Sequence, residues 1–344
     1  MTTAIEANAA WATCNFPVMS FESVTKRVVA DAVLSRAESG SIFWDNPAPR
    51  SFVRGAVYDS AGKLCADSQR MGGVNADLVI SVNPPILAQR ERLEAADTRL
   101  DGQWLYAGSW MHGFGHFLVE TLPTLWPLFE SGAEFDGIVA HRFNSPRTYD
   151  WQFEILRLLT DAEVRVVLDS PAVASQLTVA TRPYHYQREI SAVADKVWTA
   201  VSEAAGGAIA APVYLSRTLF HKEQGARSGR EFANSEAVDD LFREHGFDVL
   251  FPETMSVTEQ IRAARSAPIL AGQSGSALHL SVFQQPGGRV LEVGDSRTRG
   301  KMIGTQQAIC AIKKQQVAQI PYKADDAGNL DLLNLRNALA PLIA

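Results

Sequence analysis

The second half of the chain alternates short apolar runs with segments of helical spacing. Four runs have the length of buried strands, at residues 213–216, 247–251, 268–270 and 289–293. Helical patterns lie between them, at residues 236–245, 256–266 and 277–283. Strands and helices that alternate through short links predict a parallel sheet covered by helices on both faces.

Local signals support these assignments at the helix ends. Gly246 follows the helix predicted at 236–245, where glycine commonly ends a helix. Ser256 and Glu259 have the spacing of a capping box, in which a hydroxyl at the helix start is followed three residues later by a carboxylate. The final segment, 330–343, has the pattern of an amphipathic helix, and we expect it to pack back across the first domain.

The first half is less regular. Residues 52–82 predict short strands and turns, because their apolar runs are broken by Gly, Asp and Asn. Within 110–130 a glycine-rich turn opens a strongly apolar helical segment. Further elements are expected in this half, namely strands at 137–140 and 164–168 and helices at 151–159 and 195–205.

The length of the chain suits two domains. It has 344 residues, whereas single cores seldom grow beyond roughly 250–300 residues. The pair Gly206-Gly207 and the linker-like run at 208–212 mark a boundary. We expect an N-terminal α/β domain at 1–207, a C-terminal Rossmann-like domain at 208–325 and a separate C-terminal helix at 326–344.

Composition narrows the class of protein. Hydrophobic residues make up 46% and charged residues 20%, as in a folded soluble protein, and the net charge of −6 gives no footprint for nucleic acid. Cys14, Cys65 and Cys310 have no metal-binding spacing, and their odd number argues against a disulfide framework. No apolar run reaches the ~18 residues of a membrane span, and the N-terminus lacks a secretion signal. We expect a cytoplasmic protein without a metal site, for which attachment at the inner face of a membrane stays open.

A turn rich in glycine and serine follows the run 268–270, with the sequence Ala271-Gly272-Gln273-Ser274-Gly275-Ser276. Small residues between a strand and a helix let backbone N–H groups face a ligand, and the helix start favours an anion. The turn therefore predicts a phosphate or diphosphate site, in which Gln273 and Ser274 can bind phosphate or sugar oxygens. His279 is a further candidate, and its structural alternative is packing in the core against Phe283.

A second cluster begins at His112 and continues through His116 and Glu120. If a helix begins near Gly115, His116 and Glu120 are four residues apart and share one face. Such a pair can act as a general base and its orienting partner, or it can be a structural ion pair. Pro123 should kink or end this helix, because proline lacks the backbone donor.

A third cluster is basic and polar. Arg217 directly follows a predicted strand, where its guanidinium can bind a phosphate bidentately. Arg230 and Asn234 are further candidates for the same ligand, with simple solvation as the alternative for Arg230. The polar segment 220–229 predicts a mobile loop that closes over a ligand.

Taken together, these clusters resemble the family 61 glycosyltransferases. Residues 115–123 are similar to the N-terminal signature of that family. The later elements follow in the family's order and approximate spacing, over a similarity that runs from Trp104 to Val293: Leu215-Ser216-Arg217, Arg230 with Asn234 and Glu236, Pro252-Glu253, Ser256 with Glu259-Gln260, residues 272–278, and Pro286-Gly287.

The resemblance implies an α/β protein of GT-B architecture, with two Rossmann-like domains facing across a cleft. It places the nucleotide-sugar donor in the C-terminal domain and the acceptor in the cleft, with His112 on the acceptor side. It further implies an inverting transfer that needs no metal or other cofactor. The chain departs from the family where Gln273-Ser274-Gly275 stands for a frequent Pro-His-Gly, and where Thr124 follows the proline in place of arginine. These departures bear on the identity of the donor more than on the fold.

The sequence thus predicts a hexosyl- or pentosyltransferase that moves a sugar from a nucleotide sugar to a saccharide acceptor, in synthesis of a surface or capsular polysaccharide. His116 and Glu120 are the expected catalytic residues. The expected donor-binding residues are Arg217, Arg230, Asn234, Gly272, Gln273, Ser274, Gly275, Ser276 and His279. Two alternatives stay open, namely a nucleotide-sugar epimerase and a non-catalytic nucleotide- or saccharide-binding protein of the same fold.

Overall fold

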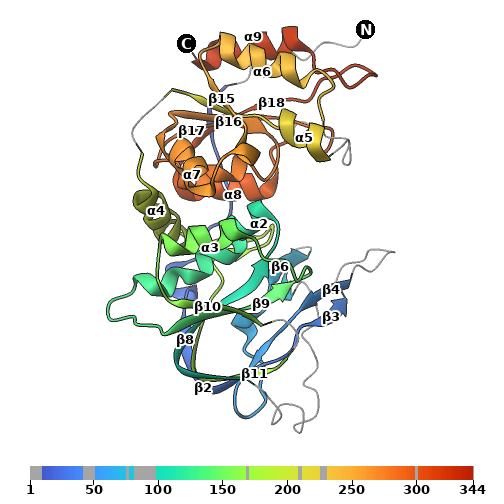
Figure 1. The fold of residues 1–344 in the computed structure, drawn as a ribbon. Coiled ribbons are helices and arrows are strands. Elements are labelled where there is room, and N and C mark those ends of the chain that lie inside the picture. The colour runs from blue at the N-terminus through green and yellow to red at the C-terminus, as the bar shows by residue number, and fades with distance from the viewer. Residues whose placement is uncertain are drawn as a thin grey trace. The chain divides into compact units, whose positions relative to one another are not determined.

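The structure is a computed structural model, and it describes residues 10–41, 51–74, 77–80, 98–167, 170–207, 211–224, 231–298 and 301–343. The chain divides into two compact units (Figure 1). The N-terminal unit is Pro17–Ala200, and the C-terminal unit combines Met1–Phe16 with Val201–Ala344. Each unit contains a mixed six-stranded sheet, so the α/β class is confirmed.

The sheet of the N-terminal unit has the strand order β10-β9-β8-β11-β2-β5. The strands β10, β9, β8 and β11 are parallel, whereas β2 and β5 are added antiparallel. The described strands and helices of this unit are β2 (Lys26–Leu34), β3 (Glu38–Ser41), β4 (Ser51–Arg54), β5 (Val57–Tyr58), β6 (Met71–Val74), β7 (Asp77–Ile80), β8 (Thr98–Met111), α2 (Phe114–His116), β9 (Gly137–Phe143), α3 (Asp150–Arg157), β10 (Glu163–Val167), β11 (Ala172–Ala180), β12 (Tyr184–His185), β13 (Glu189–Ile190) and α4 (Val193–Ala205), which crosses into the next unit.

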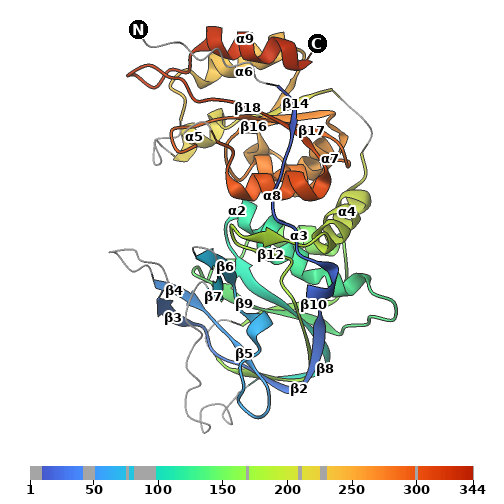
Figure 2. The same cartoon turned by 180° about the vertical axis from the view of Figure 1, so that it is seen from behind.

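The sheet of the C-terminal unit has the order β1-β18-β17-β16-β14-β15, with only β1 antiparallel to its neighbour. Its helices lie on both faces, with α6 and α9 on one side and α7 and α8 on the other (Figures 1 and 2). The elements are β1 (Ala12–Thr13), β14 (Val213–Leu215), α5 (Thr218–Gln224), α6 (Ser235–Glu244), β15 (Asp248–Leu250), α7 (Val257–Ser266), β16 (Ile269–Gln273), β17 (Arg289–Val293), α8 (Gly304–Lys313), β18 (Gln316–Ile320) and α9 (Leu332–Ile343).

The five parallel strands of this sheet have a doubly wound order. Across the sheet their order is β15-β14-β16-β17-β18. After β14 the chain adds β15 on one side, and it then crosses back past β14 to add β16, β17 and β18 on the other side. In such sheets ligands bind beyond the carboxyl ends of the strands, at the point where the winding reverses. Here that point lies between β14 and β16.

The two ends of the chain differ from the sequence prediction. Residues 12–13 form β1, which pairs with β18, and the partly buried Trp11 packs on the same core, so the chain start belongs to the C-terminal unit rather than the N-terminal one. Helix α9 buries Leu335 and Leu339 in the core of the C-terminal unit, so it is part of that unit rather than a separate segment. The positions of both chain ends depend on packing against distant segments, which the local periodicity of the sequence does not predict.

Most elements predicted in the second half are confirmed, with two differences. The strand expected at 268–270 continues to Gln273, because Gly272 and Gln273 pair with β17. The loop expected over 220–229 is wrong for its first part, which belongs to α5. That helix starts where the Thr218 amide donates to Ser216 Oγ at 3.1 Å. The rest of the predicted loop lies outside the described residues.

Candidate active site

The first candidate cluster lies where the central strand of the N-terminal unit ends. Strand β8 is buried from Trp104 to Met111, as expected for a strand with parallel neighbours on both sides. Gly113 then starts α2, which continues as a π-helical turn at Phe117–Thr121 and a 3-10 helix at Leu122–Phe129. The interruption predicted at Pro123 thus takes the form of a change in helix type.

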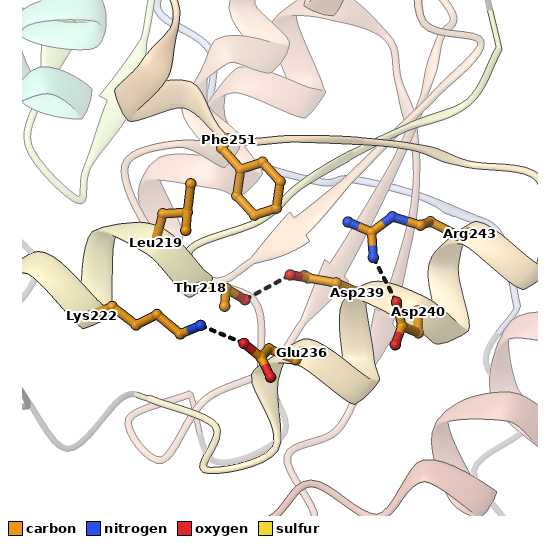
Figure 3. Close-up of a pocket in the computed structure, with 8 residues that line it drawn as sticks. All are labelled: Thr218, Leu219, Lys222, Glu236, Asp239, Asp240, Arg243 and Phe251. Atoms are coloured by element: carbon orange, nitrogen blue, oxygen red, sulfur yellow. Dashed lines mark hydrogen bonds and ion pairs between the residues drawn. The ribbon is translucent and has the colours of Figure 1, made fainter.

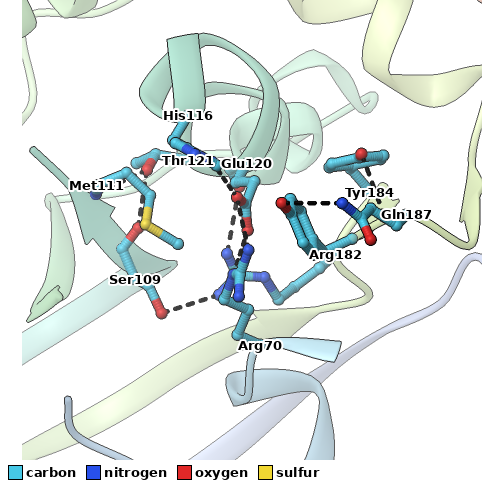
Figure 4. A network of polar contacts seen from close by, with 10 residues as sticks. Arg70, Ser109, Met111, His116, Glu120, Thr121, Arg182, Tyr184 and Gln187 are labelled. Atoms are coloured by element: carbon cyan, nitrogen blue, oxygen red, sulfur yellow. Dashed lines mark hydrogen bonds and ion pairs between the residues drawn. The ribbon is translucent and has the colours of Figure 1, made fainter. Parts of the chain in front are cut away.

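His116 and Glu120 are in contact, as their spacing predicts (Figure 4). The imidazole Nδ1 lies 2.6 Å from Glu120 Oε1. The other side of the carboxylate is held by Arg70, whose Nε and Nη2 donate to Oε2 at 2.6 Å and to Oε1 at 3.1 Å. Glu120 is almost fully buried, while half of the His116 side chain is exposed. The carboxylate is therefore inside the protein and the imidazole faces outward.

Burial alone would raise the pKa of the Glu120 carboxyl. The Arg70 guanidinium and the hydrogen bonds from His116 and Arg70 outweigh burial, and they hold that pKa well below its usual range. The same partnership raises the pKa of Arg70 against the effect of its own burial. Glu120 is thus an ionised carboxylate at neutral pH and an acceptor for an N–H on His116 Nδ1.

A polar scaffold holds this pair in place (Figure 4). Thr121 Oγ1 donates to the Ser109 carbonyl at 2.8 Å and accepts from the Met111 amide at 3.1 Å. The Arg182 guanidinium donates to Ser109 Oγ at 3.2 Å. It passes Gly108, where an added Cβ would come within 2.7 Å of Arg182 Nη1. The end of β8 therefore fixes the helical turn that carries Glu120.

The second candidate cluster lies at the reversal point of the C-terminal sheet. Arg217 follows β14, and Gly275 lies in the turn after β16. An added Cβ on Gly275 would stand 3.1 Å from Arg217 Nη1, and the φ of +142° at this position favours glycine. The structure thus brings together Arg217 and the Gly/Ser turn, which the sequence assigned to one ligand.

The other predicted donor-binding residues have more varied surroundings. Gly272 and Gln273 lie within β16 rather than in a turn, and Ser274 is fully buried. Ser276 is exposed, and His279 is largely buried in the 3-10 helix that follows the turn.

Asn234 uses its side chain to hold the backbone of Leu330, with hydrogen bonds of 2.9 and 2.8 Å. This contact gives Asn234 a structural role, and its donor-binding role stays a prediction. Arg230 lies outside the described residues. His112 is exposed just before α2, in keeping with an acceptor-side position that also stays a prediction.

Sequence reasoning missed three residues at these clusters. Arg70 stands 50 positions before Glu120, so no local spacing signals their contact. Arg297 follows β17 and donates from Nη2 to the Ser274 carbonyl at 3.1 Å. Glu292 lies in β17 beneath the turn with no exposed surface, and burial raises its pKa to about 7 against opposing hydrogen bonds from Ser274 and Gln319.

A pocket of about 300 Å³ lies between α5 and α6 of the C-terminal unit (Figure 3). Its three carboxylates face two cations, with Lys222 paired to Glu236, Arg243 paired to Asp240, and Thr218 Oγ1 donating to Asp239 at 2.8 Å. The excess of carboxylates over cations disfavours a diphosphate here. The lining residues are Thr218, Leu219, Lys222, Glu236, Asp239, Asp240, Arg243 and Phe251.

Among the residues that the structure describes, no three His, Cys, Asp or Glu side chains are grouped so as to hold a metal ion. No described helix combines the length and apolar character needed to cross a bilayer.

Comparison with known proteins identifies the family. The family described as Glycosyltransferase 61 matches residues 114–291, which is more than half of the chain. No match to a curated protein was found. The matched stretch includes His116 and Arg217 and leaves out Arg70 and Arg297. Since the match spans more than half of the chain, the chain belongs to glycosyltransferase family 61 and is a glycosyltransferase.

Proposed function

We propose that this glycosyltransferase transfers a hexose or pentose from a nucleotide sugar to a saccharide acceptor, with inversion at the anomeric carbon and without a metal or other cofactor. The observation that carries the proposal is the contact of the half-exposed His116 with the buried, ionised Glu120. A role in synthesis of a surface or capsular polysaccharide, and a GT-B-like arrangement of Rossmann-like domains, belong to the same proposal. The doubly wound order of the C-terminal sheet supports the latter.

His116 is the proposed general base, and Glu120 its orienting partner. Because Glu120 is held by Arg70, it favours the tautomer of His116 with the proton on Nδ1. Nε2 then carries the lone pair that takes the proton of the acceptor hydroxyl. The Glu120 carboxylate stabilises the imidazolium that forms, as the carboxylate does in a Ser-His-Asp triad. A carboxylate with so low a pKa is itself a poor base at neutral pH.

The donor side of the proposal rests on Arg217 and the turn at Gly275. When the bond to the sugar breaks, negative charge grows on the departing diphosphate. A guanidinium can stabilise that charge through two parallel hydrogen bonds. Because Gly275 has no side chain, the Arg217 guanidinium can lie against the backbone of the turn, with Nη1 3.1 Å from the Cβ position. The base and this cation are carried by different units of the chain.

The test is release of nucleoside diphosphate from a panel of UDP- and GDP-sugars, with and without added saccharide acceptors. Wild type should release the diphosphate, and His116→Ala, Glu120→Gln and Arg217→Ala should each release it at least about 100-fold more slowly. His185→Ala is the matched control, because His185 also contacts a glutamate four residues later in the same unit, at 3.0 Å. Unchanged turnover in all three variants would overturn the assignment.

A further inference from the structure

We propose that Arg297, held by the buried Asp295, is a second arginine of the donor-diphosphate site, so that Arg217 and Arg297 bind the diphosphate from the two sides of Gly275. This inference rests on the proposed function, because it assumes that the turn after β16 receives a diphosphate. It adds a residue beyond the end of the family match at 291.

The position of Arg297 follows from the sheet. Strand β17 is the parallel neighbour of β16, so the segment after its last residue, Val293, emerges at the same edge as the turn after Gln273. Arg217 emerges at that edge from β14, on the other side of β16. Three adjacent parallel strands thus deliver an arginine, a glycine turn and a second arginine to one edge.

The two guanidinium groups converge on one point of the backbone. A Cβ added to Gly275 would lie 3.1 Å from Arg217 Nη1 and 4.0 Å from Arg297 Nη2. The same Nη2 donates to the Ser274 carbonyl, which orients the group along the turn. A diphosphate that binds at this point has oxygens enough for two arginines.

Asp295 fixes the position of the Arg297 side chain. Its carboxylate has no exposed surface, and a buried carboxylate needs partners. Arg297 donates to it from the backbone amide at 2.9 Å, from Nε at 3.0 Å and from Nη2 at 2.5 Å. The Arg297 side chain nevertheless keeps 41% of its surface exposed. One side of the guanidinium is therefore fixed to Asp295, while much of the side chain remains accessible to a ligand.

A purely structural Arg297 would serve only to compensate Asp295. The two roles differ in what a substitution changes. Loss of a structural partner lowers the stability of the protein and weakens the binding of every ligand alike. Loss of a phosphate contact weakens the binding of ligands that carry a diphosphate and leaves the affinity for the nucleoside unchanged. Asp295 is a positioning residue in this account, so Asp295→Asn should weaken the same ligands to a smaller extent.

Calorimetry with UDP, GDP, ADP, CDP and the matching nucleosides tests the inference. For the diphosphate that wild type binds best, Arg297→Ala should weaken binding by about 10- to 100-fold, as expected for loss of hydrogen bonds to a charged group, with the nucleoside affinity unchanged. Arg297→Lys keeps the positive charge and loses the forked donors of the guanidinium, so its affinity for the diphosphate should lie between those of wild type and Arg297→Ala. Arg289→Ala is the matched control, since Arg289 lies at the opposite end of β17.

The outcomes separate this inference from the proposed function. If Arg217→Ala weakens the binding of the diphosphate and Arg297→Ala leaves it as unchanged as Arg289→Ala does, the inference is wrong and the proposed function stands. An equal loss of affinity for the nucleoside and for the diphosphate in both Arg297 variants also overturns the inference, because it indicates a structural role. If wild type binds none of the four diphosphates, the donor site itself is wrong and the inference falls with it.

Discussion

Glu292→Gln should change how the stability of the protein depends on pH. Glu292 has no exposed surface, and its Oε1 accepts a hydrogen bond of 2.9 Å from Gln319 Nε2. Burial raises the pKa of this carboxyl from the ordinary 4.5 to about 7, although hydrogen bonds from Ser274 and Gln319 oppose the rise. Glutamine has the shape of the protonated side chain and cannot ionise, so it is the matched replacement.

The sign and size of the effect follow from linkage. Below about pH 4.5 the carboxyl is protonated in both the folded and the unfolded chain. As the pH rises from about 4.5 to about 7 it ionises in the unfolded chain alone, and the free energy of unfolding falls. At about 1.4 kcal/mol for each unit of pH, the loss is about 3 kcal/mol, and it is complete once the folded protein has ionised too.

Urea unfolding at a series of pH values from 4.5 to 8.5, followed by circular dichroism, measures this loss in both proteins. The two should have similar free energies of unfolding near pH 4.5, and Glu292→Gln should be the more stable by about 3 kcal/mol at pH 8. Other groups titrate equally in both and cancel in the difference. A difference between the two proteins that stays constant over the whole pH range would show that the pKa of Glu292 is not raised by folding.

Three further substitutions test other contacts. Glu120→Ala leaves Arg70 buried without its partner and should lower the free energy of unfolding by about 3–5 kcal/mol in urea; a loss below 1 kcal/mol would show that the pair is not buried. Gly275→Ala and Gly132→Ala both place alanine at a positive φ and should each cost about 1–3 kcal/mol. Only Gly275→Ala should also weaken the binding of a nucleoside diphosphate, because no described atom lies within 4 Å of a Cβ added at Gly132. Leu339→Ala should cost about 2–5 kcal/mol, since α9 is part of the core, and a neutral effect would contradict that packing.

Much of the C-terminal unit could be predicted because its signals are local. The helix expected at 256–266 begins at Ser256, where the predicted capping box forms and the hydroxyl accepts from the Glu259 amide at 3.2 Å. The strands expected at 247–251 and 289–293 match β15 and β17. Each of these signals depends on residues within one or two turns of one another. The sequence therefore predicts element type well in this unit.

What could not be predicted depends on contacts between distant segments. Strand β11 pairs with β2 across more than 100 residues, and neither was predicted. The attachment of β1 to β18 joins the two ends of the chain. Such pairings are set by packing of the whole sheet, and propensity alone does not specify them.

The candidate site divides in the same way. The His116–Glu120 contact follows from helical spacing, whereas Arg70 reaches Glu120 from another element. Arg297 could have been found, because it follows a predicted strand just as Arg217 does.

In the proposed reaction, His116 takes the proton of the acceptor during a sugar transfer from a nucleotide donor. The rate of nucleoside diphosphate release at saturating donor, for wild type and His116→Ala side by side, tests this role. We expect a rate about 100- to 10,000-fold lower in His116→Ala, with the affinity for the nucleoside diphosphate unchanged. Release by His116→Ala at the wild-type rate would contradict this role.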